Sequence, residues 1–154
     1  MTDAEVLARR CAAVMWKDDA ASQSLGMIID HAGPGIARLT MKVRADMVNG
    51  LGLCHGGLIC TLADSTMAFA ANAHGAHAVA HHFAITFIRP GRHDEILTAE
   101  ATERSRQGRA GIYDVTVTGS SDGSVVAEFR GHTRLTGGRF FPADTAFSQP
   151  LKTR

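Results

Sequence analysis

The segment from Leu58 to Asn72 limits the possible folds of this 154-residue chain more than any other. Arranged at 3.6 residues per turn, it places apolar side chains on nearly every side. A helix that is apolar all round is a buried helix. Other elements of the chain must therefore surround it.

Alternating apolar and polar residues predict strands that could form this surrounding layer. The expected strands are 27–30, 36–43, 78–89, 95–103, 111–118 and 125–135, with the first two joined as a hairpin across Gly33-Pro34-Gly35. Residues 3–17 have the spacing of an amphipathic helix. We expect an α+β fold in which an antiparallel sheet curls around the long helix. One domain should cover residues 1–138, and 139–154 should form a loosely attached tail.

Composition narrows the functional classes. Sixteen Lys and Arg against fifteen Asp and Glu give a net charge of +1, so we expect no nucleic-acid partner. Three cysteines without a CxxC pair predict neither a disulfide framework nor a zinc site, and suit a reducing compartment. The acidic start and the lack of a long apolar run predict no signal peptide and no membrane span. These features indicate a soluble, cytoplasmic protein.

Asp64 is the first candidate for chemistry, because it lies inside the apolar helix with no Lys or Arg within reach along it. A buried carboxylate costs several kcal/mol unless something compensates. A structural role remains open, in which the carboxylate accepts hydrogen bonds from backbone amides of a neighbouring segment.

The triplet His55-Gly56-Gly57 is the second candidate, because it lies at the amino end of the same helix. The free N–H groups and the positive end of the helix dipole point outward there. Two glycines allow a substrate oxygen to approach these amides closely, as an oxyanion hole for acyl transfer requires.

The spacing between the two candidates predicts a shared site. Gly56 and Asp64 are eight residues apart, which is about 12 Å at 1.5 Å per residue. An Asp side chain cannot span that distance to reach a carbonyl held at the helix start. We therefore expect a homodimer, in which Gly56 of one copy and Asp64 of the other flank one substrate.

Five stretches of the sequence, in order, resemble a known family. They are Met47-Val48-Asn49-Gly50 with Cys54-His55-Gly56-Gly57 and Leu62-Ala63-Asp64; Phe87-Ile88-Arg89-Pro90-Gly91; Gln107-Gly108-Arg109; Tyr113-Asp114; and Phe129-Arg130-Gly131. From about Asp18 to Gly138 the chain is similar to the PaaI-like thioesterases of phenylacetate degradation, in the hotdog-fold acyl-CoA thioesterase superfamily. The resemblance implies the hotdog fold, with dimers commonly paired into tetramers. The implied reaction is hydrolysis of an aryl-acyl or medium-chain acyl-CoA.

The resemblance also implies roles for single residues. Asp64 takes the place of the acid that activates water or attacks the thioester, Gly56 that of the oxyanion donor, and His55 lies beside it. Asn49, in the first matching stretch, is a further catalytic candidate. Asp18 stands where the family has an asparagine that orients the nucleophile, and its second carboxylate would repel Asp64 unless it is protonated or turned away.

Further residues are expected to contact the substrate or coenzyme A, since Arg suits phosphate binding and small residues allow close approach. They are Gly57, Thr61, Ser65, His82, Arg89, Gly108, Arg109 and Ala110. We expect no cofactor beyond the coenzyme A of the substrate. We expect no metal site either, because Gly75 interrupts the histidines at 74, 77, 81 and 82, and His81 and His82 should point to opposite faces of a strand.

Two other functions remain open on the same fold. A non-hydrolysing acyl-CoA sensor would keep Gly56 and the arginines, but it needs no buried acid. A hydratase or dehydratase would ordinarily pair a histidine with an acid, and His55 is the only candidate. Asp64 argues against the sensor. The sequence also matches the thioesterase stretches better than it matches a hydratase or dehydratase.

Overall fold

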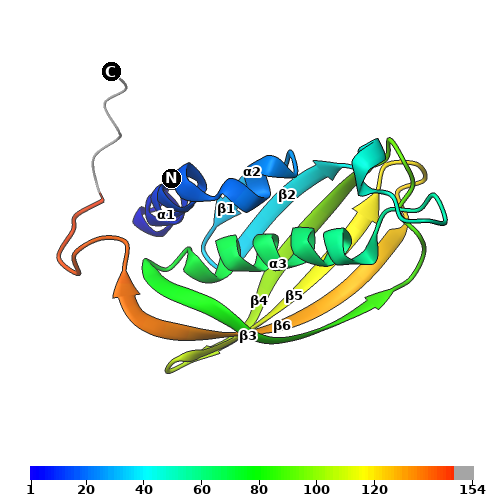
Figure 1. Ribbon diagram of the computed structural model, residues 1–154. Coiled ribbons are helices and arrows are strands. Elements are labelled where there is room, and N and C mark those ends of the chain that lie inside the picture. Colours follow the sequence, from blue (N-terminus) through cyan, green and yellow to red (C-terminus); the bar gives the residue numbers. More distant parts are fainter. Residues whose placement is uncertain (148–154) are drawn as a thin grey trace, which may run out of the picture.

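The computed structural model describes residues 1–147 and places one long helix against a six-stranded antiparallel sheet (Figure 1). The elements are α1 (Asp3–Asp18), α2 (Ala20–Ser24), β1 (Ile28–Gly33), β2 (Ile36–Lys42), the 3-10 turn η1 (Ala45–Met47), α3 (Gly56–Asn72), β3 (Ala76–Phe87), β4 (Ile96–Gln107), β5 (Ala110–Gly119) and β6 (Val125–Arg139). The strand order is β1-β2-β4-β5-β6-β3. The predicted fold class is therefore confirmed.

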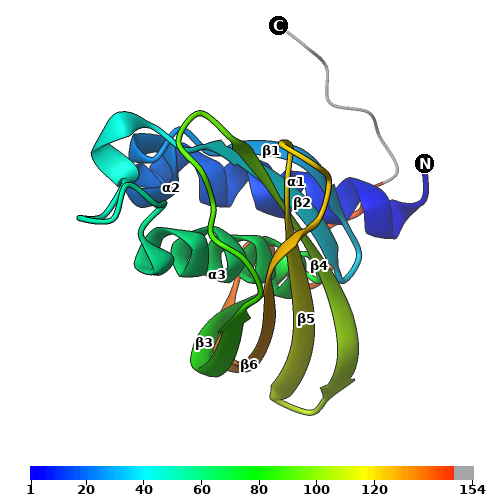
Figure 2. The ribbon, with the colours of Figure 1, turned by 90° about the vertical axis from the view of Figure 1, so that its right-hand side faces the viewer.

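The sheet curls around α3, while α1 and α2 cover the side next to β1 and β2 (Figure 2). Leu62, Ala63 and Met67 of α3 are almost completely buried. They belong to one apolar cluster with the inward residues of the sheet, such as Leu39 and Val115. Burial against the sheet thus explains most of the apolar character of α3, while one stripe of the helix stays half-exposed in the described structure. Within residues 1–147, no helix combines the length and hydropathy needed to cross a membrane.

Several boundaries differ from the predicted ones, each for a local reason. Helix α3 begins at Gly56 instead of Leu58, because the His55 side chain caps it. The short helix α2 was not predicted; the Asp19 carboxylate caps it by accepting from the Ser22 N–H at 2.9 Å. Strands β4 and β5 are longer than predicted, because Gly108, with φ of +57°, closes a tight turn between them.

A loosely attached tail is expected over 139–154, whereas Arg139, its first residue, still belongs to the sheet. Strand β6 continues to Arg139, which pairs with Ala76 of β3. The Phe140 N–H then donates to the Gly75 carbonyl at 3.0 Å. Residues 148–154, the rest of the predicted tail, lie outside the described residues.

Strand β3 is an edge of the sheet, and its residues from Val79 to Ala84 are all exposed. Among them and just after them are large apolar side chains: Val79, Phe83 and Phe87 are 51%, 41% and 49% exposed. The opposite edge, β1, lies beside α1. Within residues 1–147, an apolar face and an unpaired backbone edge therefore coincide along β3.

Candidate active site

Asp64 lies in the middle of α3, on the only stripe of this helix that is not buried. Among residues 1–147 its carboxylate has no hydrogen-bond or ion-pair partner. Burial raises the pKa of Asp64 above its ordinary value of 3.8. The structural role left open by the sequence, in which backbone amides satisfy the carboxylate, is therefore not what this structure shows. A half-buried acid without a partner is a typical catalytic group.

The start of α3 is organised by His55. Its Nδ1 accepts a hydrogen bond from the Gly57 N–H at 2.9 Å, so that amide is occupied. In a neutral imidazole the proton then sits on Nε2, which is left as a donor. The Gly56 N–H has no acceptor within the described part of the chain. Of the two glycines, Gly56 thus offers the free amide at the helix start.

Each of the two candidate groups, Gly56 and Asp64, lines a hollow of its own. The Gly56 hollow, about 290 Å³, is lined by Asn49, Leu53, Cys54, Gly56, Ile59 and Phe87–Pro90. The Asp64 hollow, about 470 Å³, is lined by Asp64, Ala68 and Asn72 of α3, by His77–Ala80 and Thr136 of the sheet, and by Met15 and Phe140. One chain therefore keeps Gly56 and Asp64 in separate hollows, as their spacing along α3 requires.

A hollow larger than these two lies elsewhere. It measures about 600 Å³ between α1 and β1 and is lined by Arg9, Ala12, Ala13, Trp16, and residues 27–32. None of the candidate residues lines it. We place the candidate site at the Gly56 and Asp64 hollows, because they contain the candidate catalytic groups and the larger hollow does not.

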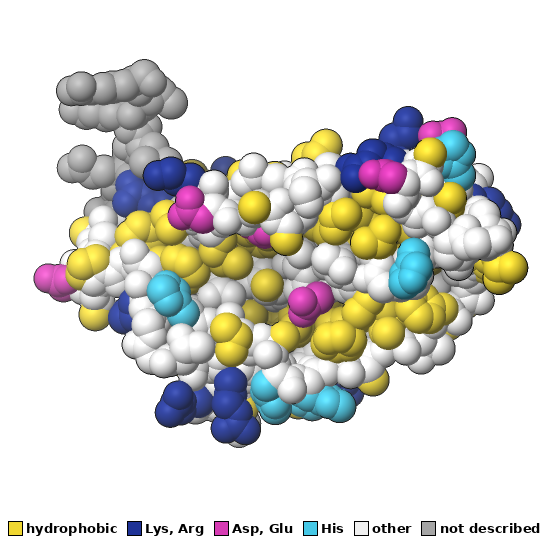
Figure 3. Space-filling view, viewed as in Figure 1, with side chains coloured by type: hydrophobic (Ala, Val, Ile, Leu, Met, Phe, Trp, Pro, Cys, Tyr) yellow, Lys and Arg dark blue, Asp and Glu magenta, His cyan; other side chains and the backbone are white. Residues whose placement is uncertain are grey.

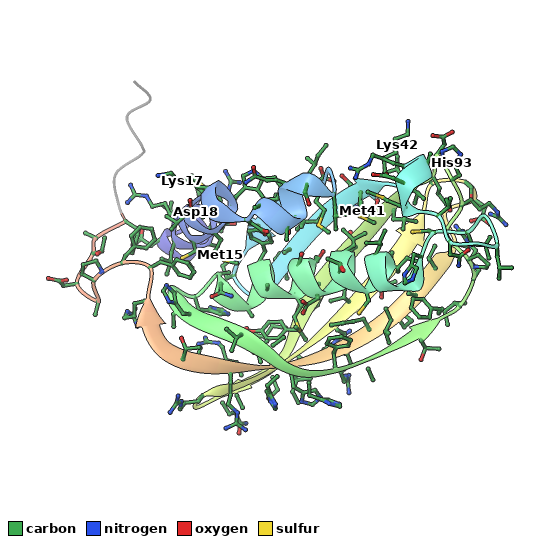
Figure 4. All side chains as sticks on the ribbon, viewed as in Figure 1. Met15, Lys17, Asp18, Met41, Lys42 and His93 are labelled. Carbon is green, nitrogen blue, oxygen red and sulfur yellow. The ribbon has the colours of Figure 1, made fainter. Side chains whose placement is uncertain are left out.

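Asn49 lies at the Gly56 hollow, and Asp18 does not reach Asp64. The Asn49 Oδ1 accepts from the Leu51 and Leu53 amides at 2.9 and 3.2 Å, which leaves its side-chain NH₂ group without a partner in the described range. Asp18 is exposed at the end of α1, with Lys17 beside it, whereas Met15 faces α3 (Figure 4). The predicted repulsion between Asp18 and Asp64 is thus avoided, because Asp18 is turned into solvent.

Thr61 and Ser65 share the half-exposed stripe of α3 with Asp64. The Thr61 hydroxyl donates to the Gly57 carbonyl at 2.8 Å. The Ser65 hydroxyl is 3.0 Å from that of Ser22, which ties α3 to α2. Both hydroxyls therefore already have partners within the chain.

Arg89 was expected to hold a coenzyme A phosphate, but its guanidinium is committed within the chain. It donates to the buried Glu95 carboxylate at 2.7 and 3.2 Å, to Asp122 at 3.1 Å, and to Ser124 at 2.7 Å. Its remaining N–H bonds the Pro90 carbonyl at 2.8 Å. These partners use its donors and hold it as a structural ion pair in the lining of the Gly56 hollow, and a phosphate role for Arg89 stays a prediction.

Arg109, with Gly108 and Ala110, forms the turn between β4 and β5, and lines neither the Gly56 hollow nor the Asp64 hollow. The Arg109 guanidinium donates to the Leu135 carbonyl at 3.0 and 3.3 Å, and is otherwise exposed. A phosphate role for this turn stays a prediction.

His82 is expected to contact the substrate or coenzyme A, and the structure places it on the face of the sheet away from α3. It pairs with His132 of β6, whose neighbour Gly131 faces Met67 of α3. Alternation along the strand therefore turns His132 and His82 away from α3. A bulge between Ala80 and His82 also brings the His81 ring to 6.2 Å from His132, so His81 and His82 do not take opposite faces as expected.

Of the ten residues that line the Asp64 hollow, the sequence named only Asp64 as a site residue, and the large side chains of Met15, His77 and Phe140 are among those it missed. They come from α1, β3 and the segment after β6, so no local pattern links them. Their meeting depends on the fold. The only indication in the sequence was the apolar stripe of the first helix, which had to pack against another part of the chain.

Comparison with known proteins identifies the family. A model of the thioesterase superfamily matches residues 51–126. The acyl-coenzyme A thioesterase PaaI of Escherichia coli is 40% identical over 124 residues, which cover 80% of this chain and 88% of that protein. The solved structure of E. coli PaaI, a protein of the phenylacetic acid degradation operon, superposes with a TM-score of 0.85 at 38% identity, covering 88% of this chain and 97% of the other.

A more distant relative has been solved with a ligand. It is a hypothetical thioesterase of Streptococcus pneumoniae, determined with coenzyme A, with a TM-score of 0.70 and 25% identity. The match covers 73% of this chain and 90% of that protein. With its curled sheet, its central helix and these relatives, the chain belongs to the hotdog-fold thioesterase superfamily, as a PaaI-like member.

Proposed function

We propose that this protein hydrolyses an aryl-acyl or medium-chain acyl-CoA to the free acid and coenzyme A, in a site that combines Asp64 of one copy with Gly56 of a second. The aryl class is that of phenylacetyl and hydroxyphenylacetyl groups. The observation that carries the proposal is the Asp64 carboxylate, half-buried and without a partner in the described chain. The relatives named as acyl-CoA thioesterases support it.

The chemistry suits a thioester. Its carbonyl is electrophilic and its thiolate leaving group needs little protonation, so one acid or base and an oxyanion hole suffice. In the proposed site the Gly56 N–H stabilises the negative oxygen that forms, and Asp64 either activates a water molecule or attacks the carbonyl itself. The His55 Nε2–H is a second donor beside Gly56.

The second copy is proposed to pack along β3. This edge combines free backbone groups with exposed apolar side chains, and it runs beside the stripe of α3 that carries Asp64. In Figure 3, apolar side chains gather over α3 and the sheet below it. A two-fold axis at this edge would bring the start of one α3 toward the middle of the other. The working unit would then be a homodimer with two sites, and two such dimers would form the proposed homotetramer.

One assay tests the reaction and the role of Asp64. Free thiol is followed with phenylacetyl-, hydroxyphenylacetyl-, benzoyl- and straight-chain acyl-CoAs, for the wild type and for Asp64→Asn. We expect kcat/KM to fall at least about 100-fold, following the usual contribution of a general base. The control is Asp30→Asn, because Asp30 is an exposed carboxylate in the hollow between α1 and β1, away from the candidate site. Equal losses in both variants, or unchanged turnover in Asp64→Asn, would refute the assignment.

Stability gives an independent readout for the same variant. Because the pKa of Asp64 is raised in the folded state, its ionised form opposes folding at neutral pH. Asp64→Asn should therefore unfold at the same or a higher temperature while losing activity. A joint loss of stability and activity would indicate a structural role.

Mixed dimers test the shared site. Copies carrying Asp64→Asn are combined with copies carrying Gly56→Ala, whose added Cβ would lie 3.0 Å from the Phe87 ring and crowd the helix start. One of the two sites in such a dimer keeps both wild-type groups, so part of the activity should return. Verified heterodimers without any recovery would exclude a site built from two chains.

A further inference from the structure

Small side chains leave the Asp64 hollow open, and large side chains bound it. Ala68 of α3 and Ala78 and Ala80 of β3 line it. Ala68 lies one helical turn beyond Asp64, and Ala78 is hydrogen-bonded to Asn72, one turn further along. Phe140 and Met15 also line it, and Phe140 lies beside the end of α3, where its N–H bonds Gly75. From Asp64 to Asn72 the helix rises about 12 Å. The hollow thus leads from the acid toward an aromatic side chain that comes from outside the helix and the sheet.

The segment that carries Phe140 is anchored on both sides. Before it, Arg139 pairs with Ala76 at the end of the sheet. The Phe140 ring then packs edge-on against His77, with 4.3 Å between centroids. Beyond it, Phe141 packs against Phe147 at 5.5 Å, and the Arg10 guanidinium of α1 lies 5.4 Å from the Phe147 ring. The pairing of Arg139, the Phe140 N–H bond to Gly75 and the His77 contact hold Phe140 in place at the hollow.

We infer that Phe140 is a specificity-determining residue, which closes the far end of the acyl pocket and sets the longest acyl group that the enzyme accepts. The inference rests on the proposed function, since it takes the Asp64 hollow as the acyl pocket. An acyl group bound at Asp64 would run along Ala68 and the two alanines of β3 toward Phe140. The segment after β6 would then control substrate length without touching the reacting atoms.

The test compares acyl-chain profiles of matched variants. The ratio of kcat/KM for decanoyl-CoA to that for phenylacetyl-CoA is measured for the wild type, Phe140→Ala and Phe141→Ala. Phe141 is the matched control, because it is an aromatic residue of the same segment that does not line the hollow. Removing the end wall should raise the ratio at least about tenfold in Phe140→Ala, the usual worth of matching apolar groups to a pocket. Phe141→Ala should leave the ratio unchanged.

Two further variants keep the test decisive if Phe140→Ala folds poorly, which thermal unfolding reports. Phe140→Leu should raise the ratio, and Phe140→Trp should lower it, because one shortens and the other thickens the wall. An unchanged ratio in the Phe140 variants, or an equal change in Phe141→Ala, would overturn the inference while the proposed function stands. If the wild type hydrolyses none of the thioesters, the proposed function fails and the inference fails with it.

Discussion

The ion pair between Glu95 and Arg89 makes a quantitative prediction, because Glu95 is the most buried carboxylate of the described chain. Its side chain is 1% exposed, and that of Arg89 is 14% exposed. The carboxylate accepts two hydrogen bonds from Arg89, two from Ser121 and one from the Arg92 amide. These partners, led by Arg89, lower the pKa of Glu95 from 4.5 to about 2.

The lowered pKa converts into stability. At about 1.4 kcal/mol per pH unit, the difference corresponds to about 3 kcal/mol in favour of the folded state. Because the folded pKa lies below the unfolded one, this stabilisation is fully present above pH 4.5 and is lost as the pH falls toward 2. More than half of it should be gone at pH 3.

Urea unfolding of the wild type and Glu95→Gln at pH 7 and pH 3 measures this contribution. Both proteins are kept at one concentration, because any self-association adds to the apparent stability. Glu95→Gln should be clearly less stable at pH 7, and the gap should narrow at pH 3. Asp122→Asn is the control, since Asp122 bonds the same guanidinium but is 54% exposed, so its effect should be much smaller. A gap that is equal at the two pH values would refute the reasoning.

Three further predictions follow from single groups. Because burial raises the pKa of Asp64 and the reaction needs its carboxylate, kcat/KM should fall on the acid side at a pH above 3.8; a pH–rate profile that stays flat down to pH 4 would contradict this. Burial raises the pKa of Cys11 and of Cys54 to about 11. Both thiols should therefore resist iodoacetamide at pH 8 in the folded protein and react in urea, which mass spectrometry can measure. Rapid labelling without urea would contradict this prediction. Gly35→Ala should lower the thermal unfolding temperature more than Gly123→Ala. Both glycines have a left-handed backbone, which costs an alanine about 1–2 kcal/mol, but only the added Cβ at position 35 meets another side chain, at 2.9 Å. Equal losses would contradict the role of this contact.

The sequence predicted the fold wherever periodicity decided the outcome. The buried helix around Asp64 and the six strands were expected from their patterns, since burial on one face imposes a period of two or 3.6. The boundaries were less accurate because side chains set them. The His55 cap starts α3 two residues early, and α2 depends on one Asp19 bond.

The site was predicted only as far as the residues of one helix reach. Asp64 and Gly56 were found because both lie on α3, where spacing fixes their separation. The ion pairing of Arg89 was not foreseen, because nothing in the sequence reveals that Asp122 and Ser124 fold back onto it. Phe140 and His77 were missed because only the curl of the sheet brings them to the hollow that Asp64 lines.

The exposed edge at β3 has a consequence for handling the protein. A long strand with unpaired amides and exposed Val79, Phe83 and Phe87 is a template for uncontrolled strand addition. In the proposed homodimer the second copy would cover this edge, so dimer formation would also protect the protein against precipitation. Substitutions along β3 should therefore first reduce the yield of recoverable protein during expression, before any rate can be measured. Variants intended to separate the copies are best examined at high dilution and low temperature, where aggregation is slow.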